Sequence, residues 1–388
     1  MVRPASTSPT AGRVVAAVAA TFILSACVPD IPEFSPDGRT LAFTLDDSLA
    51  LIDTRTKAVR VLPDSTSGWW PSWSPDGRYI AFFVPPDEQV KLYDSVTRQT
   101  RLLAQGAIPF AWREDGRRLA AFRERGGRSE VVVLTPDGDI TLTARLPTED
   151  PPGPHVEFVV RVVRMVWVPN TDTLALLAGD RAGSNVYLIE AGEVHRITMA
   201  GDVIGLGLLD TGRRLVLARG PRVTGPVTLH TYDLSNRTWV RLPVFIPSEA
   251  LRPEPGFGRD VQNVIFSPGG SRLALGMRFE PRTSAAVYSP STYQAWYTAS
   301  VVDPNPRRVW RTEEFARGFV VSAATWSRDG QLAIADTYYV GDLVEFELSR
   351  IVVTLHGAGG QVRGSWTAVT SRRSGSACDQ ISSRFSRP

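Results

Sequence analysis

A short pattern of apolar and polar residues recurs along the chain. Each copy begins with an aromatic residue or leucine, passes through a tight polar turn, and ends in a short apolar strand. The clearest copies are Phe34-Ser-Pro-Asp-Gly-Arg-Thr-Leu-Ala-Phe43 and Trp73-Ser-Pro-Asp-Gly-Arg-Tyr-Ile-Ala-Phe82. In such a turn proline presets φ, aspartate binds its own backbone, and glycine supplies the positive φ that reverses the chain. The pattern therefore predicts pairs of antiparallel strands.

The pattern occurs seven times, with spacings of 39, 39, 55, 41, 58 and 60 residues. The first residues of the copies are Phe34, Trp73, Trp112, Trp167, Leu208, Phe266 and Trp326. In the better copies two more strands follow: residues 91–103 have the pattern of a strand, a turn and a strand, and residues 53–57 form the same turn one copy earlier. Each unit is therefore predicted to contain four short antiparallel strands, with no long helical period between units.

Four-stranded units at a period of about 40–45 residues are typical of a β-propeller. Each sheet has two apolar faces and cannot bury both alone, whereas radial packing buries them and leaves only short edges. We therefore expect an all-β fold, a seven-bladed β-propeller of four-stranded antiparallel blades spanning residues 34–370. Six blades are the alternative, if the fourth or fifth copy, whose turns are degenerate, is not a blade.

The Trp-Ser-Pro-Asp-Gly-Arg-x-Ile/Leu-Ala-Phe pattern resembles the repeat of TolB-type propellers, over roughly residues 31–370. That group also includes propellers fused to serine peptidases. The resemblance implies the propeller fold and leaves the function open, because one fold hosts many functions. TolB itself has six blades and a separate N-terminal α/β domain and works with the Pal lipoprotein in the periplasm, whereas here the repeats follow a predicted lipid anchor.

The beginning of the chain resembles a bacterial lipoprotein signal. Arg3 and Arg13 flank a polar start, an apolar run extends from Val14 to Leu24, and Leu24-Ser-Ala-Cys27 resembles a lipobox. Such a short run cannot span a bilayer, which takes about 20 residues. The resemblance implies removal of residues 1–26, diacylglycerol on the Cys27 thiol, and a lipidated tether over residues 27–33. We therefore expect a protein in the cell envelope, outside the cytoplasm, with its N-terminal lipid in a membrane.

Composition agrees with a globular protein, since 43% of the residues are hydrophobic and 21% are charged. The net charge is only +3, and the basic residues are scattered arginines, so no nucleic-acid partner is expected. The two cysteines are Cys27 and Cys378. If Cys27 carries lipid, no internal disulfide can form. The polar tail of residues 371–388, which contains Cys378, is predicted to be disordered.

No catalytic set is recognisable in the sequence. His356-Gly-Ala-Gly-Gly360 resembles the oxyanion loop of α/β-hydrolases, but no Gly-x-Ser-x-Gly motif accompanies it, so a hairpin turn is the favoured interpretation. The four histidines are far apart and lack the spacing of zinc ligands. We therefore expect no enzyme activity, cofactor or bound metal, although ligands from distant strands could still converge on a metal in the channel.

The extra length in some repeats is the best clue to function. In a four-stranded blade, connections between blades lie on the same face as connections between the second and third strands. Residues 147–162, 243–260 and 280–292 form the longest insertions, and all are expected on that face. Insertions on one face commonly mark a binding surface. The candidate binding residues are Phe158, Phe257, Arg259, Tyr293, Trp296 and Tyr297. Alternatively, these segments only fill the mouth of the channel.

We therefore expect a non-catalytic binding module for a protein, a peptide or an envelope glycan. The alternative is a propeller enzyme, a lyase or hydrolase with its site at the channel mouth. Such an enzyme needs carboxylates, histidine or a metal converging at the ends of the inner strands, which the sequence does not reveal. A structural envelope protein without a specific ligand is a third possibility.

The predicted lipobox is tested by replacing the lipidated residue. Cys27→Ser should abolish lipid attachment and move the protein from the membrane fraction to the soluble fraction, because the thiol is the attachment point. Fractionation of cells that express either protein measures the change. A variant that stays in the membrane as completely as the wild type would show that something other than the lipid anchors it.

Overall fold

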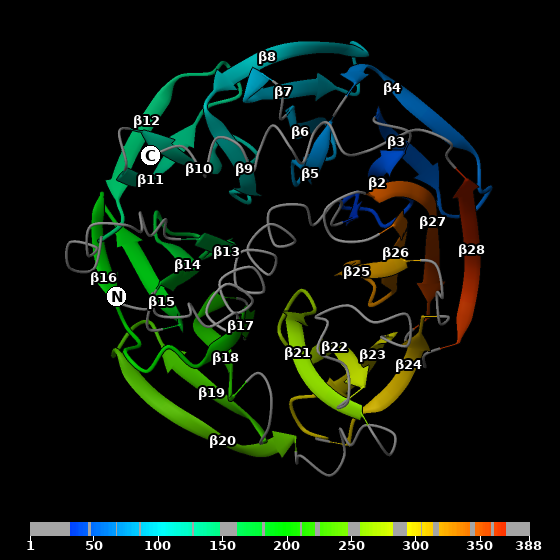
Figure 1. The fold of residues 1–388 in the computed structure, drawn as a ribbon. Helices are drawn as coiled ribbons and strands as arrows, with labels where there is room; N and C mark the ends of the chain where they lie inside the picture. Colours follow the sequence, from blue (N-terminus) through cyan, green and yellow to red (C-terminus); the bar gives the residue numbers. More distant parts are fainter. Residues whose placement is uncertain are drawn as a thin grey trace, which may run out of the picture.

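The computed structural model forms a ring of seven four-stranded sheets, a seven-bladed β-propeller (Figure 1). The six-bladed alternative is therefore wrong. All elements in the described part of the chain are β-strands, and no helix there is long and apolar enough to cross a membrane. The structure describes residues 32–45, 48–66, 68–84, 87–125, 128–147, 161–180, 183–209, 212–221, 226–246, 257–281, 293–303, 305–312, 318–341, 346–357 and 361–369. The predicted signal, residues 27–31 of the tether and the polar tail lie outside these residues.

The blades, numbered 1 to 7 along the chain, each use four consecutive strands, ordered from the channel to the rim (Figure 1). Blades 1 to 4 comprise β1 (Glu33–Phe34), β2 (Thr40–Leu45), β3 (Ser48–Asp53), β4 (Val59–Thr66); β5 (Trp69–Trp73), β6 (Tyr79–Val84), β7 (Gln89–Asp94), β8 (Gln99–Gln105); β9 (Ala107–Trp112), β10 (Leu119–Arg125), β11 (Arg128–Leu134), β12 (Ile140–Arg145); and β13 (Arg161–Trp167), β14 (Leu174–Asp180), β15 (Gly183–Glu190), β16 (Glu193–Arg196). Blades 5 to 7 comprise β17 (Val203–Leu209), β18 (Arg214–Arg219), β19 (Val227–Asp233), β20 (Thr238–Ile246); β21 (Phe257–Phe266), β22 (Arg272–Pro281), β23 (Tyr293–Ser300), β24 (Arg307–Arg311); and β25 (Gly318–Trp326), β26 (Leu332–Gly341), β27 (Phe346–His356), β28 (Val362–Val369).

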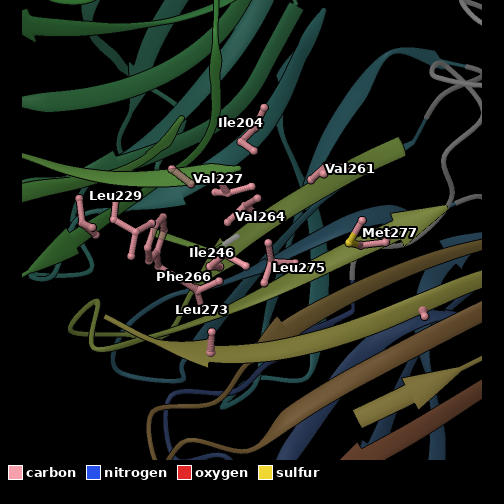
Figure 2. Packing of buried hydrophobic residues seen from close by; sticks show 14 of the residues in the cluster. Ile204, Val227, Leu229, Ile246, Val261, Val264, Phe266, Leu273, Leu275 and Met277 are labelled. Atoms are coloured by element: carbon pink, nitrogen blue, oxygen red, sulfur yellow. The ribbon is translucent and has the colours of Figure 1, made fainter. Parts of the chain in front are cut away.

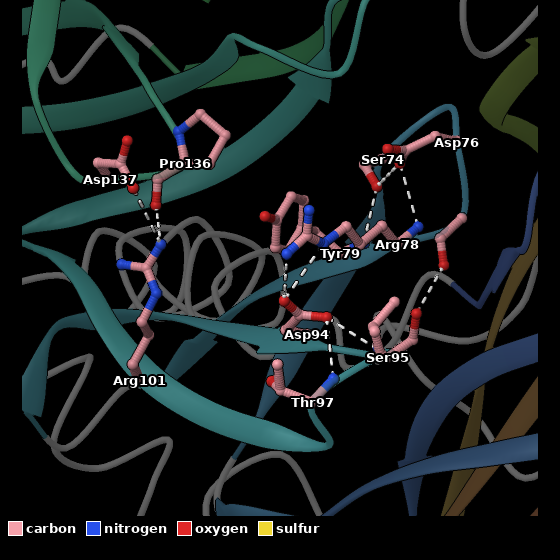
Figure 3. Close-up of polar contacts among 12 residues, drawn as sticks. Ser74, Asp76, Arg78, Tyr79, Asp94, Ser95, Thr97, Arg101, Pro136 and Asp137 are labelled. Carbon is pink, nitrogen blue, oxygen red and sulfur yellow. Dashed lines mark hydrogen bonds and ion pairs between the residues drawn. The ribbon is translucent and has the colours of Figure 1, made fainter.

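The polar turns form as their composition predicts. In blade 2 the Ser74 hydroxyl donates to Asp76 Oδ1 (2.5 Å), and the same oxygen accepts the Arg78 N–H (3.0 Å) (Figure 3). Gly77 takes a φ of 74° and donates its N–H to the Ser74 carbonyl (2.9 Å). The third and fourth strands are joined by a second turn, in which Asp94 Oδ1 accepts the Val96 N–H (2.8 Å). Both turns are therefore closed by local hydrogen bonds that their own residues supply.

The apolar faces of the blades pack against each other. Seven clusters of buried residues are present, and each spans one pair of neighbouring blades. The largest joins blades 5 and 6 and includes Leu229, Phe266 and Leu275 (Figure 2). The alanines that follow the turns, such as Ala42 and Ala81, are fully buried and let adjacent sheets approach. The core is therefore distributed around the ring rather than gathered at one centre.

Indole groups add a hydrogen bond between blades. Trp112 Nε1 donates to the Ser72 carbonyl of the preceding blade (3.0 Å), and Trp167 Nε1 donates to the Ala111 carbonyl in the same way (3.0 Å). In both cases the acceptor directly precedes the aromatic residue of the preceding repeat. Trp73 occupies the same position in blade 2, but its buried Nε1 has no partner in the described structure. In blades 3 and 4 the indole therefore fills the interface and also hydrogen-bonds a backbone carbonyl of the preceding blade.

Among the described strands, the ring closes between blades 7 and 1 without exchange of a strand. Each sheet is formed by consecutive strands only, and β1 is just two residues long. Closure instead depends on a cluster in which Phe34, Leu41 and Phe43 of blade 1 meet Ile351 and Val353 of blade 7. Side-chain packing therefore takes the place of the backbone hydrogen bonds that a shared sheet would supply.

Trp73 and Trp112 give a matched pair for testing these interfaces. Both are buried between blades, so Trp→Ala at either site should lower the free energy of unfolding by about 3–5 kcal/mol. Trp→Phe should separate the sites, because only Trp112→Phe removes an indole hydrogen bond, and it should cost about 1 kcal/mol more than Trp73→Phe. Equilibrium unfolding in urea measures both differences. Equal losses for the two Trp→Phe variants would contradict the role given to the Ser72 contact.

Candidate functional site at the loop face and in the channel

The alternation of strand directions divides the connections between two faces of the ring. The turns between first and second strands and between third and fourth strands lie on one face, here called the turn face. Connections between second and third strands and those between blades lie on the other, here called the loop face. All three insertions predicted from the sequence connect strands at the loop face: residues 147–162 and 243–260 join blades, and residues 280–292 join β22 to β23. Most of each insertion lies outside the described residues.

The candidate binding residues with described side chains all belong to blade 6. Arg259 lies on β21, and Tyr293, Trp296 and Tyr297 lie on β23. Phe257 begins β21, but its side chain is outside the description, as is all of Phe158. Tyr293 and Trp296 are only 3% and 1% exposed, because each face of a blade is covered by its neighbour. These two rings therefore lie in the interior, Tyr297 is partly exposed, and the binding face itself stays a prediction.

Tyr293 is held between an aromatic ring and a cation at the loop end of blade 6. Its ring stacks on Phe279, with centroids 4.8 Å apart, and the Arg311 guanidinium lies 3.9 Å from the Tyr293 centroid. The strand register explains the contact, since Arg259, Phe279 and Tyr293 lie side by side across β21, β22 and β23. A cation over a partly desolvated ring is favourable, so Arg311 is fixed in place.

The opposite face of blade 6 carries a carboxylate between polar partners. Asp260 Oδ2 accepts hydrogen bonds from Arg278 Nη2 (3.2 Å) and Gln262 Nε2 (2.5 Å). Arg278, like Arg259, is only 9% exposed. The described charged side chains at this end of the blade are the arginines at 259, 278 and 311 and the carboxylate of Asp260.

A buried polar seam joins blade 6 to blade 7. Gln294 Nε2 donates to the Val320 carbonyl (2.7 Å), and its Oε1 accepts the Ser322 N–H (3.1 Å), so one side-chain amide bonds to the backbone of β25. Trp296 Nε1 donates to Ser322 Oγ (2.7 Å), which in turn donates to Asp336 Oδ1 (2.6 Å). Trp296 thus has a structural contact that accounts for its burial.

Asp336 ends this seam and is completely buried. Its second oxygen, Oδ2, accepts a hydrogen bond from Trp310 Nε1 (2.5 Å). Burial raises the pKa of Asp336 to about 6, although the hydrogen bonds from Ser322 and Trp310 act in the opposite direction. The carboxyl is shielded from solvent and therefore serves the interface between the blades.

His356, the first residue of the motif that resembles an oxyanion loop, lies in the same seam. It is 1% exposed and ends β27, and the Gly357 N–H donates to the Gln361 carbonyl (2.9 Å) across the turn to β28. The imidazole Nε2 lies 3.2 Å from Thr354 Oγ1, and the Trp310 ring packs against the imidazole with centroids 5.6 Å apart. The hairpin interpretation therefore agrees with the strand pairing.

Charged residues are rare on the innermost strands, and two of them, Glu33 and Arg164, are partly buried. Glu33 of β1 belongs to blade 1 and Arg164 of β13 to blade 4, and these blades are not neighbours. The charge of each residue nevertheless affects the pKa of the other. Burial raises the pKa of Glu33 to about 8, while the Trp73 N–H and the charge of Arg164 oppose that rise. Burial also lowers the pKa of Arg164, which the charge of Glu33 partly offsets.

Neither residue was among the candidates predicted from the sequence, although each stands out when the repeats are aligned. The position before the first aromatic residue holds Glu33 in blade 1 but an uncharged residue in every other copy: Ser72, Ala111, Val166, Gly207, Ile265 and Thr325. Three residues before that aromatic, only blade 4 carries a charge, Arg164. A charge at a position that is otherwise apolar or small is informative, since inner strands offer little solvation.

Within the described residues, no group of three or more histidine, cysteine, aspartate or glutamate side chains is placed to hold a metal ion. Neither a protein-family profile nor a curated protein sequence matches the chain.

The similarities to solved structures define a class, the β-propellers. The β-propeller domain of Cps50 (Swd1) from Myceliophteria thermophila is 18% identical, with a TM-score of 0.52 over 79% of this chain and 93% of that one. The hydrazine synthase of Kuenenia stuttgartiensis is 13% identical, with a TM-score of 0.52 over 89% and 96%. An oligogalacturonate lyase in complex with manganese is 12% identical, with a TM-score of 0.51 over 78% and 84%. At such identities the likeness concerns the fold alone.

The raised pKa of Asp336 predicts a particular dependence of stability on pH. A group that binds its proton more tightly in the folded state adds stability that is complete below its unfolded pKa of 3.8 and is lost as the pH rises through about 6. Between pH 4 and pH 7.5 the wild type should therefore lose roughly 2–3 kcal/mol more unfolding free energy than Asp336→Asn, because asparagine does not titrate. Urea unfolding of both proteins at the two pH values measures it. Parallel curves for both would mean that Asp336 does not titrate in this range.

Proposed function

We propose that the protein is a lipid-anchored, non-catalytic binding module in the cell envelope, which holds a protein, peptide or envelope glycan at its loop face. One observation carries the proposal. The three longest insertions start and end at the loop face, and the ends of two of them at blade 6 include the Asp260–Arg278 ion pair and the stacked rings of Phe279 and Tyr293. A rigid base below long segments is the usual design of a binding surface.

The predicted anchor gives this face an orientation. The innermost strand of each blade starts at the loop face, so the tether of residues 27–33 enters β1 from that side. The seven residue steps from Cys27 to Phe34 reach about 25 Å when fully extended. The loop face therefore lies toward the membrane in our proposal, and its partner is bound at or near the membrane surface.

An enzyme is the second candidate, and one observation favours it. Glu33 lies on the innermost strand of blade 1, and with a pKa of about 8 it is protonated at neutral pH, so it could donate a proton to a substrate bound at that strand. The charge of Arg164 near it could hold an anionic substrate. Turnover of a sugar or ester substrate that Glu33→Gln abolishes, with binding retained, would favour this candidate over the binding module.

Two exposed arginines of blade 3 test the orientation as a matched pair. Arg128 begins β11 at the loop face, and Arg117 lies in the turn between β9 and β10 at the turn face. In a Cys378→Ser background, Arg128→Cys should react with a membrane-impermeant maleimide several-fold more slowly than Arg117→Cys on vesicles that display the anchored protein. Removing the anchor with Cys27→Ser should make the two rates equal. Equal rates on the anchored protein would reject the orientation.

The partner is sought by cross-linking from the same two positions. A photo-reactive residue at Arg128 should yield discrete adducts in intact cells, whereas the same residue at Arg117 should yield none or far fewer. Adducts that form equally from both faces, or a complete absence of adducts from the loop face, would contradict binding at the loop face.

A further inference from the structure

We propose that the loop-face end of blade 2 binds a neutral oligosaccharide with β-glycosidic linkages, which stacks on the indole of Trp70. The inference rests on the proposed function, because it selects a glycan among the ligand classes given there. It begins with a tryptophan that the backbone holds in an unusual conformation on the innermost strand of the blade, β5.

Trp70 has a backbone conformation that tryptophan rarely adopts. Its φ is 51°, in the left-handed region. Glycine aside, the other described residues with positive φ lie in connections between strands, except Asp64 of β4. Aspartate tolerates this region, whereas a bulky aromatic residue there is an outlier. Strain of this kind is concentrated at ligand-binding positions, where the side chain is needed in one particular place.

The strained residue belongs to a β-bulge. The register of β5 against β6 shifts between Trp69 and Ser72, so that Trp70 and Pro71 together oppose a single residue of β6. A bulge re-aims the side chain of its extra residue, and bulges are common beside binding sites. Because Pro71 has no N–H and the bulge interrupts the regular backbone, an extended peptide finds no continuous edge to pair with along β5.

Two neighbouring rings fix the indole of Trp70. The Phe83 ring is stacked against it, with centroids 5.6 Å apart and 13° between the planes. The Trp69 ring lies at 73° to it, with centroids 6.1 Å apart. Trp69 and Phe83 are buried, whereas Trp70 is partly exposed. A ligand therefore meets a flat ring whose position is set before binding, which reduces the entropy that association costs.

The exposed part of Trp70 is accessible from the axis of the ring, close to the loop face. Strand β5 is innermost in blade 2 and begins at the loop face, and Trp70 is its second residue (Figure 1). Neighbouring blades cover both faces of the sheet, and β6 covers one edge of β5. The side that remains for a ligand is therefore the one toward the axis and the loop face.

Polar side chains at the same end of blade 2 favour a neutral ligand. Gln89 and Gln105 pair across β7 and β8, and each amide can both donate and accept hydrogen bonds. Asp87 and Glu88 are exposed in the connection that leads into β7, and their negative charges disfavour an anionic glycan.

A sugar ring with equatorial substituents matches this combination of groups. Its flat face consists of C–H groups with a weak positive charge, which suits the negative face of an indole. Its hydroxyl groups lie around the rim of the ring, where amides can bind them. Since β-glycosidic linkages keep successive rings extended, one ring can stack on Trp70 while the next reaches toward Gln89 and Gln105.

The test compares ligand affinities of the purified mature protein by isothermal titration calorimetry. Chitotriose and cellotriose are neutral trimers with β-glycosidic linkages, trigalacturonate is an anionic trimer, and a polyproline peptide represents the peptide class, because it also packs against tryptophan. At least one neutral trimer should bind, and more tightly than trigalacturonate or polyproline. Trp70→Ala should weaken that binding by about tenfold or more. Trp70→Phe should weaken it less, because it keeps a flat ring.

Trp239→Ala is the matched control. Trp239 is also exposed, and its ring lies against an aromatic neighbour, Tyr232, with centroids 4.7 Å apart. It lies on the outer strand β20 of blade 5, far from the axis of the ring. Trp239→Ala should therefore bind the neutral trimer as the wild type does.

Urea unfolding separates a loss of binding from a loss of folding. Because φ is positive at position 70, Trp70→Gly should unfold at a higher urea concentration than Trp70→Ala. The reverse order would contradict the strained conformation from which the proposal starts. The proposal is also overturned if neither neutral trimer binds at about 5 mM, if trigalacturonate or polyproline binds more tightly, or if Trp70→Ala folds and keeps the wild-type affinity. Cross-linking from Arg128 without any binding of sugar would overturn only this inference and leave the proposed function standing.

Discussion

Packing between neighbouring blades is the interaction on which the whole structure depends. Every blade is a thin sheet with apolar residues on both faces, and each face is buried only when another blade covers it. Seven such interfaces close the ring, so no blade is dispensable. At the interface between blades 7 and 1, β1 contributes only two residues, and each described sheet is formed by strands of one blade. Phe34 and Phe43 pack against blade 7 in the cluster that joins the two blades.

The two faces of the ring differ in construction. At the turn face, short turns of neighbouring blades bond to one another. Asp172 of blade 4 forms ion pairs with Arg113 and Arg118 of blade 3 (2.7 Å each). Arg272 of blade 6 donates a hydrogen bond to the Gly330 carbonyl of blade 7 (3.2 Å). The loop face carries the long insertions, and beneath those of blade 6 lie arginines fixed by Asp260 and Tyr293. Variation in length is tolerated where it does not disturb the packing, which leaves the loop face free for recognition.

The ionisable side chains within the ring differ in how fully their polar atoms are satisfied. Asp336 is satisfied by Ser322 and Trp310 and strengthens a contact between blades. Arg164 has no such compensation within the described structure, and Glu33 has only the Trp73 N–H. Groups that cost stability without serving the fold are typical of functional sites. The structural relatives do not decide which function this is, since they include an oligogalacturonate lyase as well as the β-propeller domain of Cps50 (Swd1).

The sequence alone determined the architecture, because the information for it is local. Turn chemistry at Asp76 and Gly77, alternating apolar strands and a repeat of fixed order specify each blade, and a two-sided sheet leaves radial packing as the solution. The connectivity also placed the three insertions on one face. What the sequence left undetermined was the environment of single side chains. Tyr293 and Trp296 resemble surface aromatics in sequence, yet neighbouring strands and the next blade bury them. Glu33 and Arg164 are 131 residues apart in the chain, and only closure of the ring brings their charges within reach across the channel.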